Sequence, residues 1–332
     1  MVDNAKFFCE EYKIDGLRLD EVSVMDRFAG WHTCQSVTGT VRFTQPNRIQ
    51  IAEYWPVDNS VVSAASSGGA GFDATWNDGL RNAVRSALSS ASSGGSSFVN
   101  MDEIAFAIQN SGIGDRWRSV QSVEDHDRVY KERDPRIPRL ADGSDARSWY
   151  ARSRSRVAMG LLLAAPGIPM LFMGQEFLED KQWSDTPDST NLIWWAGLDG
   201  GDKTMGDFLR FTRELIMLRR AQPAFRGEGC AIIHTHNTNR VIVFQRWVEG
   251  QGKDVVVVAS LNEGNLYNYQ IGFPSGGRWT EAFNSDVYDN WVNLHVSGNG
   301  GGVNADGPPL HGLSTSATVL IPANSLLVFA RS

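Results

Sequence analysis

Three acidic residues stand where catalytic side chains are expected in a parallel β/α protein. Asp20 ends the strand-like run "IDGLRLD", Glu53 ends "IQIAE", and Asp127 follows His126 at the end of "SVQSVEDHD". Because the carboxyl ends of the strands of a parallel barrel converge on one mouth, we expect these carboxylates to meet there. Such a cluster is costly unless a metal, a cationic ligand or a cationic transition state balances its charge.

Glycosyl transfer is the chemistry that this cluster suits, because its oxocarbenium-like transition state carries the balancing positive charge. The retaining route needs one carboxylate as nucleophile and one carboxyl of raised pKa as acid and then base. For each acid taken alone, a helix N-cap or a loop salt bridge is the simpler interpretation. The joint placement of all three at strand ends favours the catalytic one.

The elements that must position these acids alternate along the first two thirds of the chain. Short β-branched or apolar runs alternate with amphipathic stretches, as in parallel strands linked by helices. The predicted strands cover residues 14–20, 48–54, 119–125 and 167–174, and the predicted helices cover residues 77–89, 146–164 and 204–221. We expect the Ser/Gly-rich segments 60–71 and 86–97 to be mobile loops, and the arginines of 147–156 to lie on a solvated helix face.

The last third has a different pattern. Runs such as "RVIVFQRW", "DVVVVASLN" and "SLLVFAR" are separated by Gly and Asn turns without helical periodicity, which predicts an antiparallel sandwich. We therefore predict an α/β domain over residues 1–226 and an all-β domain over residues 227–332, with the boundary near Gly227.

Composition excludes several classes of protein. The net charge of −7 disfavours a nucleic-acid partner, and no apolar run approaches the roughly 20 residues that cross a membrane. The N-terminal sequence has no basic region followed by an apolar one, so we expect a cytoplasmic protein. Three widely spaced cysteines predict reduced thiols, and a metal at the His234/His236 pair is disfavoured because a third ligand is missing. We expect no metal and no cofactor.

Several motifs resemble those of the α-amylase family of glycoside hydrolases, in the right order. "DGLRLDEVSVMDRF", "IQIAEYWP" and "VEDHDRV" are similar to the family's strand-four, strand-five and strand-seven motifs. "GFDATWNDGL" and "APGIPMLFMGQEF" look like the strand-six and strand-eight regions, and "FTRELIMLRRAQPAF" looks like the last barrel helix. Within the family, "MGQEF" followed by "WSD" is typical of 1,4-α-glucan branching enzymes.

The resemblance implies roles for the charged residues. It makes Asp20 the nucleophile, with Arg18 as the charge partner that keeps it ionised, and Glu53 the general acid and base. It also implies that Asp127 binds sugar hydroxyls and favours a distorted ring, with His126 hydrogen-bonding beside it.

Aromatic residues near the predicted strand ends suit a glucan substrate, because sugars stack their C–H faces on rings. We expect Trp55 and Trp76 to bind substrate. Trp183, Trp194 and Trp195 follow the strand-eight region, although packing of helix against sheet explains Trp194 and Trp195 equally well.

The resemblance covers the last five units of a (β/α)8 TIM barrel and the sandwich that follows it. The strands that correspond to the first three units have no counterpart here, so we expect upstream sequence or another chain to supply them. The expected function is a retaining enzyme on α-1,4-glucan polysaccharide or oligosaccharide, foremost branching, in which a cleaved α-1,4 bond is transferred to a 6-hydroxyl. The alternatives are α-amylase-type hydrolysis and an inactive fragment that retains glucan binding.

Overall fold

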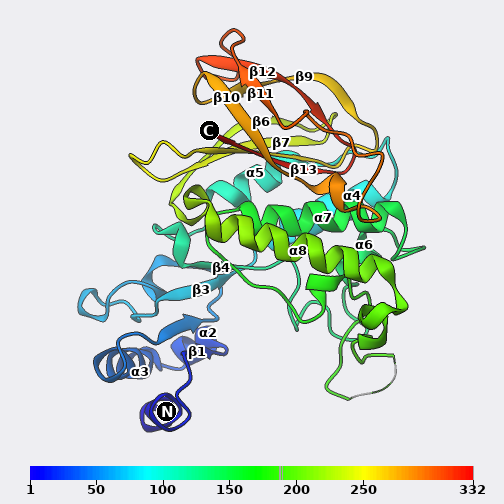
Figure 1. Cartoon of the computed structure of the whole chain (residues 1–332). Coiled ribbons are helices and arrows are strands. Elements are labelled where there is room, and N and C mark those ends of the chain that lie inside the picture. The colour runs from blue at the N-terminus through cyan, green and yellow to red at the C-terminus, as the bar shows by residue number, and fades with distance from the viewer. Residues whose placement is uncertain (187, 189, 332) are drawn as a thin grey trace. The chain divides into compact units, whose positions relative to one another are not determined.

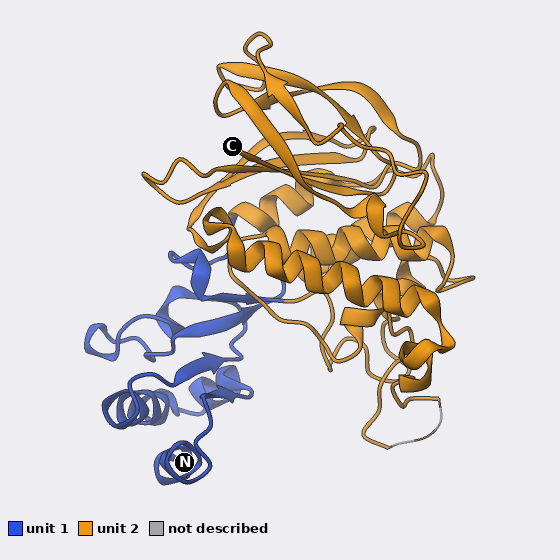
Figure 2. Ribbon diagram, viewed as in Figure 1, with its two compact units in different colours: residues 1–78, 110–121 blue, residues 79–109, 122–332 orange. Residues whose placement is uncertain are grey.

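The computed structural model describes residues 1–186, 188 and 190–331 and contains two compact units (Figure 2). Unit 1 comprises residues 1–78 and 110–121, and unit 2 comprises residues 79–109 and 122–332. No helix among the described residues is long and apolar enough to cross a membrane.

Unit 1 is a layer of parallel strands with helices between them (Figure 1). The pairs β1–β2, β2–β3 and β3–β4 are all parallel, so each strand follows its neighbour in chain order. Its strands are β1 (Gly16–Leu19), β2 (Ile49–Ala52), β3 (Ala74–Asn77) and β4 (Ser119–Gln121), and its helices are α1 (Val2–Glu11), α2 (Val22–Arg27) and α3 (Trp31–Thr44). Short 3-10 turns cover η1 (Asn59–Val61), η2 (Ala65–Ser67) and η3 (Arg116–Arg118).

The helices of unit 1 are held by their apolar faces. Cys9 of α1 and Val37 and Val41 of α3 form one small buried cluster, against which Leu17 of β1 packs. These contacts explain the spacing of the apolar residues in α3, which recur four residues apart on one side of the helix. Burial of this stripe fixes α3 beside the strand whose end carries the candidate site.

Unit 2 begins with helices and ends with antiparallel strands. Its helices are α4 (Gly79–Ser92), α5 (Met101–Gln109), α6 (Ile137–Ala141), α7 (Trp149–Ala164) and α8 (Lys203–Ala221), with the short strand β5 (Ile168–Pro169) between α7 and α8. Single turns cover η4 (Gln175–Phe177), η5 (Gly197–Gly201), η6 (Pro223–Arg226) and η7 (Ser285–Tyr288). The remaining strands are β6 (Gly229–His236), β7 (Val241–Trp247), β8 (Val255–Ser260), β9 (Leu266–Phe273), β10 (Gly277–Asn284), β11 (Gly302–Ala305), β12 (Thr315–Ile321) and β13 (Leu326–Arg331).

The larger antiparallel sheet, of strand order β11-β10-β13-β8-β7-β6, is covered on both faces. Along β8, Val255 and Val257 pack into the core formed with α4, α5, α7 and α8, whereas Val256 and Val258 pack toward the β9–β12 pair. Side chains alternate between the two faces of a strand, so burial on both faces requires the unbroken valine run rather than an apolar–polar alternation. One face of the larger sheet is therefore covered by helices, and its other face is covered by the β9–β12 pair.

The predicted fold class is confirmed: strands β1 to β5 of an α/β region are followed by an antiparallel all-β region. The domain limits 1–226 and 227–332 stay a prediction.

Two local predictions are wrong. Residues 86–92 are not a loop, because α4 continues to Ser92 with Leu88 and Ala91 fully buried. The arginines of 147–156 do form salt bridges, but their helix face is not solvated. Arg154 and Arg156 are buried, and they pair with Glu263 and Asp289.

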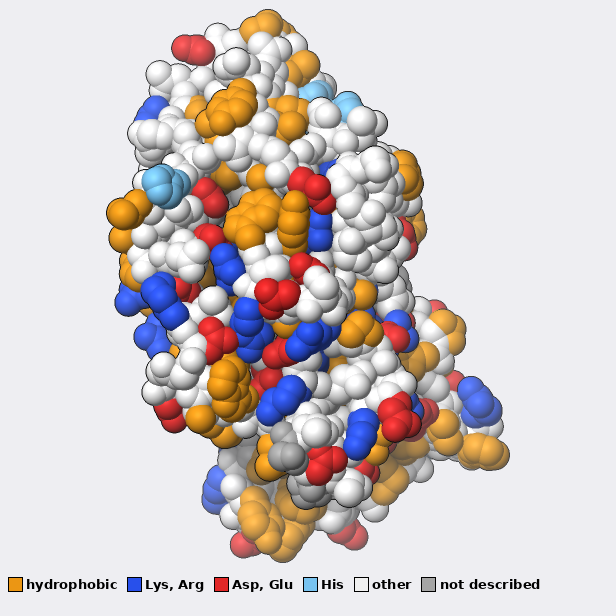
Figure 3. All heavy atoms as spheres, turned by 90° about the vertical axis from the view of Figure 1, so that its right-hand side faces the viewer, with side chains coloured by type: hydrophobic (Ala, Val, Ile, Leu, Met, Phe, Trp, Pro, Cys, Tyr) orange, Lys and Arg blue, Asp and Glu red, His pale blue; other side chains and the backbone are white. Residues whose placement is uncertain are grey.

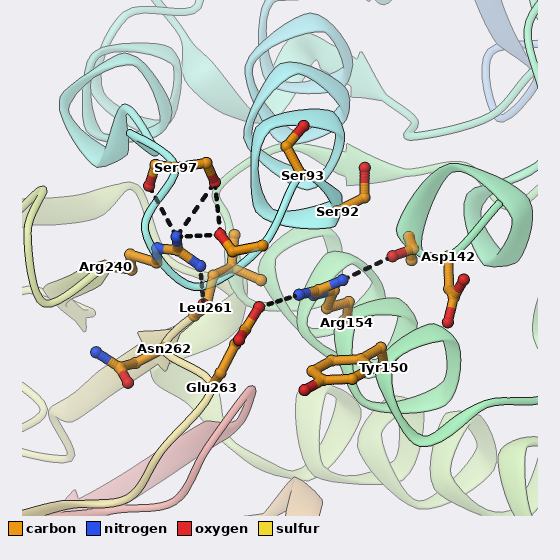
Figure 4. A network of polar contacts seen from close by, with 12 residues as sticks. Ser92, Ser93, Ser97, Asp142, Tyr150, Arg154, Arg240, Leu261, Asn262 and Glu263 are labelled. Carbon is orange, nitrogen blue, oxygen red and sulfur yellow. Dashed lines mark hydrogen bonds and ion pairs between the residues drawn. The ribbon is translucent and has the colours of Figure 1, made fainter. Parts of the chain in front are cut away.

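Arg240 ties the Ser/Gly-rich segment after α4 to the strands of the sandwich (Figure 4). Its Nη2 donates to the carbonyl oxygens of Gly94 and Ser97, each at 2.7 Å, and its Nη1 donates to that of Leu261. Nearby, Arg154 donates to a Glu263 carboxylate oxygen at 2.8 Å. Backbone acceptors thus replace water around the buried guanidinium of Arg240, and they also hold residues 94–97 in place.

Replacing Arg240 with Met is expected to lower the free energy of unfolding by about 3 kcal/mol, because carbonyl groups lose charged donors in a buried place. Urea denaturation followed by circular dichroism measures the change. Arg278→Met, which removes an exposed arginine of β10, is the matched control and should change the same quantity by less than about 0.5 kcal/mol. An equal loss in both variants would contradict the role given to Arg240.

Candidate active site

The register of β1 and β2 places two of the predicted catalytic acids side by side. Leu19 pairs with Ala52, so Asp20 and Glu53 are the next residues beyond the same end of two neighbouring strands. The Glu53 amide donates to the Leu19 carbonyl oxygen at 3.0 Å, which extends the ladder to the site. The two carboxylates therefore meet because of strand register, as expected at the carboxyl end of a parallel sheet.

Arg18 bridges the two acids. Its Nη1 donates to Oδ1 of Asp20 and its Nη2 donates to Oε2 of Glu53, each at 2.5 Å. The guanidinium lies over the ring of Trp76, with its central carbon 4.3 Å from the ring centroid. A planar fork stacked on an aromatic face is held in one orientation, so the two carboxylates are held in one geometry as well.

The two acids differ in environment. The side chain of Glu53 is 8% exposed, whereas that of Asp20 is 70% exposed. Burial raises the pKa of Glu53, and a hydrogen bond with Asp20 raises it further, while the Glu21 amide and the Arg18 charge oppose the rise. A buried carboxyl of raised pKa beside an accessible carboxylate is the arrangement required of a general acid and a nucleophile.

The turn after β1 is fixed by contacts with the segment after β2. The Glu21 amide donates to Oε2 of Glu53 at 3.2 Å, and the Trp55 amide donates to Oγ of Ser23 at 2.6 Å. The Tyr54 hydroxyl donates to Asp26 at 2.9 Å, and burial together with this bond raises the pKa of Tyr54 to about 12.

The sequence patterns do not identify these anchoring residues, because Ser23, Asp26 and Tyr54 lie outside the strand ends. The only signal was that "DEVSVMD" and "EYW" carry polar groups directly after each acid. Trp55 is half-buried in this turn, in the same unit as Glu53, and its role in binding substrate stays a prediction.

His126 and Asp127 belong to unit 2. The His126 Nε2 lies 3.6 Å from Oδ2 of Asp127, and Trp183 donates its indole N–H to the His126 carbonyl oxygen at 2.6 Å. The buried Asp125 accepts from the Asp127 amide at 3.1 Å and pairs with Arg81, so it fixes the backbone of this loop. Asp125 is thus a positioning residue of the "VEDHD" motif, to which the sequence alone assigned no role.

A metal centre finds no support in the described part of the chain, where no group of three or more His, Cys, Asp and Glu side chains is arranged to hold an ion. The His234 ring instead stacks on that of His311 at 4.0 Å and bonds the Tyr269 hydroxyl at 2.9 Å. Burial and the neighbouring histidines lower the pKa of His234 to about 4. These contacts account for His234 structurally.

Comparison with known proteins agrees with the fold. Residues 232–332 match the family model described as the α-amylase C-terminal all-β domain. The chain is 27% identical to a 1,4-α-glucan branching enzyme of Pseudomonas syringae pv. tomato, over 99% of this chain and 45% of that protein. It is 30% identical to the 1,4-α-glucan branching enzyme of Burkholderia thailandensis, over 99% of this chain and 41% of that protein. The chain thus spans less than half the length of these curated relatives.

Solved structures show the same fold. An α-amylase from Geobacillus thermoleovorans, complexed with acarbose, superposes with a TM-score of 0.71 at 19% identity, over 100% of this chain and 63% of the other. A pullulanase from Anoxybacillus, complexed with maltotetraose, superposes with a TM-score of 0.66 at 21% identity. This match covers 100% of this chain and 46% of the pullulanase chain.

The barrel-type strands, the sandwich and the acid pair define a protein built like the glycoside hydrolases of the TIM-barrel class. The chain is a distant relative of proteins of the α-amylase family, whose C-terminal all-β domain matches residues 232–332.

Arg18→Met is expected to raise the pKa of Glu53, because the variant removes the cation that opposes burial. Glu53 therefore stays protonated to higher pH in the variant than in the wild type. Titration of the ¹³C-labelled Glu carboxyl groups by NMR measures this shift. Arg48→Met, which removes the arginine paired with Asp15, is the control and should leave the Glu53 titration unchanged. A fall in the pKa of Glu53 in Arg18→Met would contradict the assignment.

Proposed function

We propose that the protein is a retaining glucan-active enzyme that cleaves α-1,4 bonds and transfers the chain to a 6-hydroxyl, as a 1,4-α-glucan branching enzyme does. The observation that carries this proposal is the Arg18 bridge between an accessible Asp20 and a buried Glu53 of raised pKa. Two acids of unlike environment, fixed side by side, are what the double-displacement reaction requires.

In the first step, a carboxylate oxygen of Asp20 attacks the anomeric carbon while Glu53 donates its proton to the leaving glycosidic oxygen. The bond from the anomeric carbon to that oxygen breaks, and an ester bond to Asp20 forms. Arg18 keeps Asp20 ionised and oriented until it attacks.

In the second step, the Glu53 carboxylate takes the proton of an incoming hydroxyl, whose oxygen displaces Asp20 from the anomeric carbon. The ester breaks and Asp20 becomes a free carboxylate again. Each step inverts the configuration at the anomeric carbon, so the two steps together retain it. The acceptor is a 6-hydroxyl in branching and water in hydrolysis.

The remaining predicted residues take binding roles in this proposal. Asp127 would accept hydrogen bonds from sugar hydroxyls, with His126 beside it. The ring of Trp76, over which the Arg18 guanidinium lies, and the ring of Trp55 would contact the sugar.

Branching is favoured over hydrolysis because 1,4-α-glucan branching enzymes match almost the whole chain. The same acids serve an α-amylase, so hydrolysis is the second candidate. The third is a non-catalytic protein that retains glucan binding.

Incubation of the chain with amylose separates these candidates. Branching is expected to lower the iodine staining with few new reducing ends, whereas hydrolysis produces many reducing ends. Glu53→Gln should lower the rate by at least about 100-fold, because it removes the general acid. Glu10→Gln, at a partly exposed position of α1, is the matched control and should keep the full rate.

Each result has a distinct reading. A fully active Glu53→Gln variant would exclude the proposed acid. A folded wild type that binds amylose without changing it would exclude catalysis by this chain alone and favour the binding protein.

A further inference from the structure

A hollow of about 550 Å³ lies in unit 2 between the start of α7 and the segment that follows β10. It is lined by Trp149 of α7 and by residues of the segment 286–297, of which Asp286, Asn293 and His295 matter here. None of the candidate catalytic or substrate-binding residues lines it. It therefore has no part in the proposed reaction.

The segment that lines the hollow is ordered by its own hydrogen bonds. The Asn293 side chain donates to the Asp286 carbonyl oxygen and accepts from the His295 amide, each at 2.9 Å. The Ser297 amide donates to Oδ2 of Asp286 at 2.9 Å, and Asn265 donates to the Ser297 hydroxyl at 3.0 Å. A site held in this way loses little conformational entropy when a ligand binds.

The charges around the hollow balance. Asp286 and Asp289 line it, and Asp289 accepts from two arginines outside the lining, from Arg152 at 3.0 Å and from the buried Arg156 at 3.2 Å. Figure 3 likewise shows acidic and basic side chains interspersed on the face that it presents. Balanced charge selects neither an anion nor a cation, and metal-type clusters are absent from the described residues. A neutral ligand fits this balance.

The hollow offers both an apolar face and hydrogen-bonding groups. The Trp149 ring is half-buried, and its indole N–H has no acceptor among the described residues. Within the same part of the chain, Oδ1 of Asp286 has no donor. Val292 and Leu294 also line the hollow and are 53% and 86% exposed. Such a mixture matches a sugar, which has apolar C–H faces and hydroxyl groups around its edge.

We propose that this hollow binds a neutral α-glucan oligosaccharide, with a glucose ring stacked on Trp149 and hydroxyl groups bonded to Asp286. The choice of glucan rests on the proposed function, whereas the neutral, polyhydroxylated character of the ligand follows from the lining itself. The site holds a glucan chain at a place where none of the proposed catalytic groups acts on it.

Hydroxyl-radical footprinting tests the proposal on the full chain, in the Glu53→Gln variant so that the ligand is not consumed. Maltoheptaose at millimolar concentration is expected to slow the oxidation of Trp149 several-fold. The exposed Phe98 of the same unit does not line the hollow, and its oxidation should be unchanged. Unchanged oxidation of Trp149 at saturating maltoheptaose overturns the proposal.

Affinity electrophoresis in glycogen-containing gels gives an independent readout. Trp149→Ala is expected to weaken retardation about tenfold, because stacking on the ring is lost. Trp149→Phe should keep most of it, and Phe98→Ala should match the parent chain. Equal retardation of the Trp149→Ala and Phe98→Ala variants counts against the site.

The outcome is separable from the fate of the proposed function. Protection of Trp149 in a chain that leaves amylose unchanged supports the binding site while catalysis fails. Conversely, activity that depends on Glu53, without protection of Trp149, supports the enzyme and overturns the second site.

Discussion

The Arg18 guanidinium is the interaction on which the candidate site depends. It holds an accessible and a buried carboxylate at once and rests on Trp76, so three strands contribute to one rigid group. Two carboxylates at neighbouring strand ends would repel each other without a shared cation. The register of β1 and β2 brings the two carboxylates together. The guanidinium of Arg18 offsets their repulsion, while the pKa of Glu53 stays raised.

Buried arginines serve a different purpose in unit 2. Arg240 and Arg246 donate to backbone carbonyl oxygens of segments that are distant in the sequence. A guanidinium has five N–H donors in a rigid plane, so one side chain can satisfy several loop ends at once. Through Arg246, the carbonyl groups of Ala164 and Gly227 are fixed to β7, which joins α7 to the sandwich within this unit.

The two proposed sugar sites differ in charge, and the difference matches their proposed tasks. At the strand ends of unit 1, two carboxylates share one cation, which suits a transition state with developing positive charge. In the hollow beside α7, carboxylates and guanidinium groups balance, which suits a neutral chain that only has to bind. The similarity to 1,4-α-glucan branching enzymes is the reason for proposing a glucan as the ligand of both.

The sequence by itself determined the order of the elements, the fold class and the acids at the strand ends. Period-two and helical patterns are local, and Asp20 and Glu53 follow strands whose ends must converge. It could not show that the helix continues past residue 89 to Ser92 or that Arg154 is buried, because both depend on packing against distant segments. Tertiary structure alone decided the contact of Arg18 with Glu53, the anchoring by Tyr54 and Asp125, and the hollow at Trp149. Each of these joins residues that are far apart in the chain, and local patterns carry no information about such contacts.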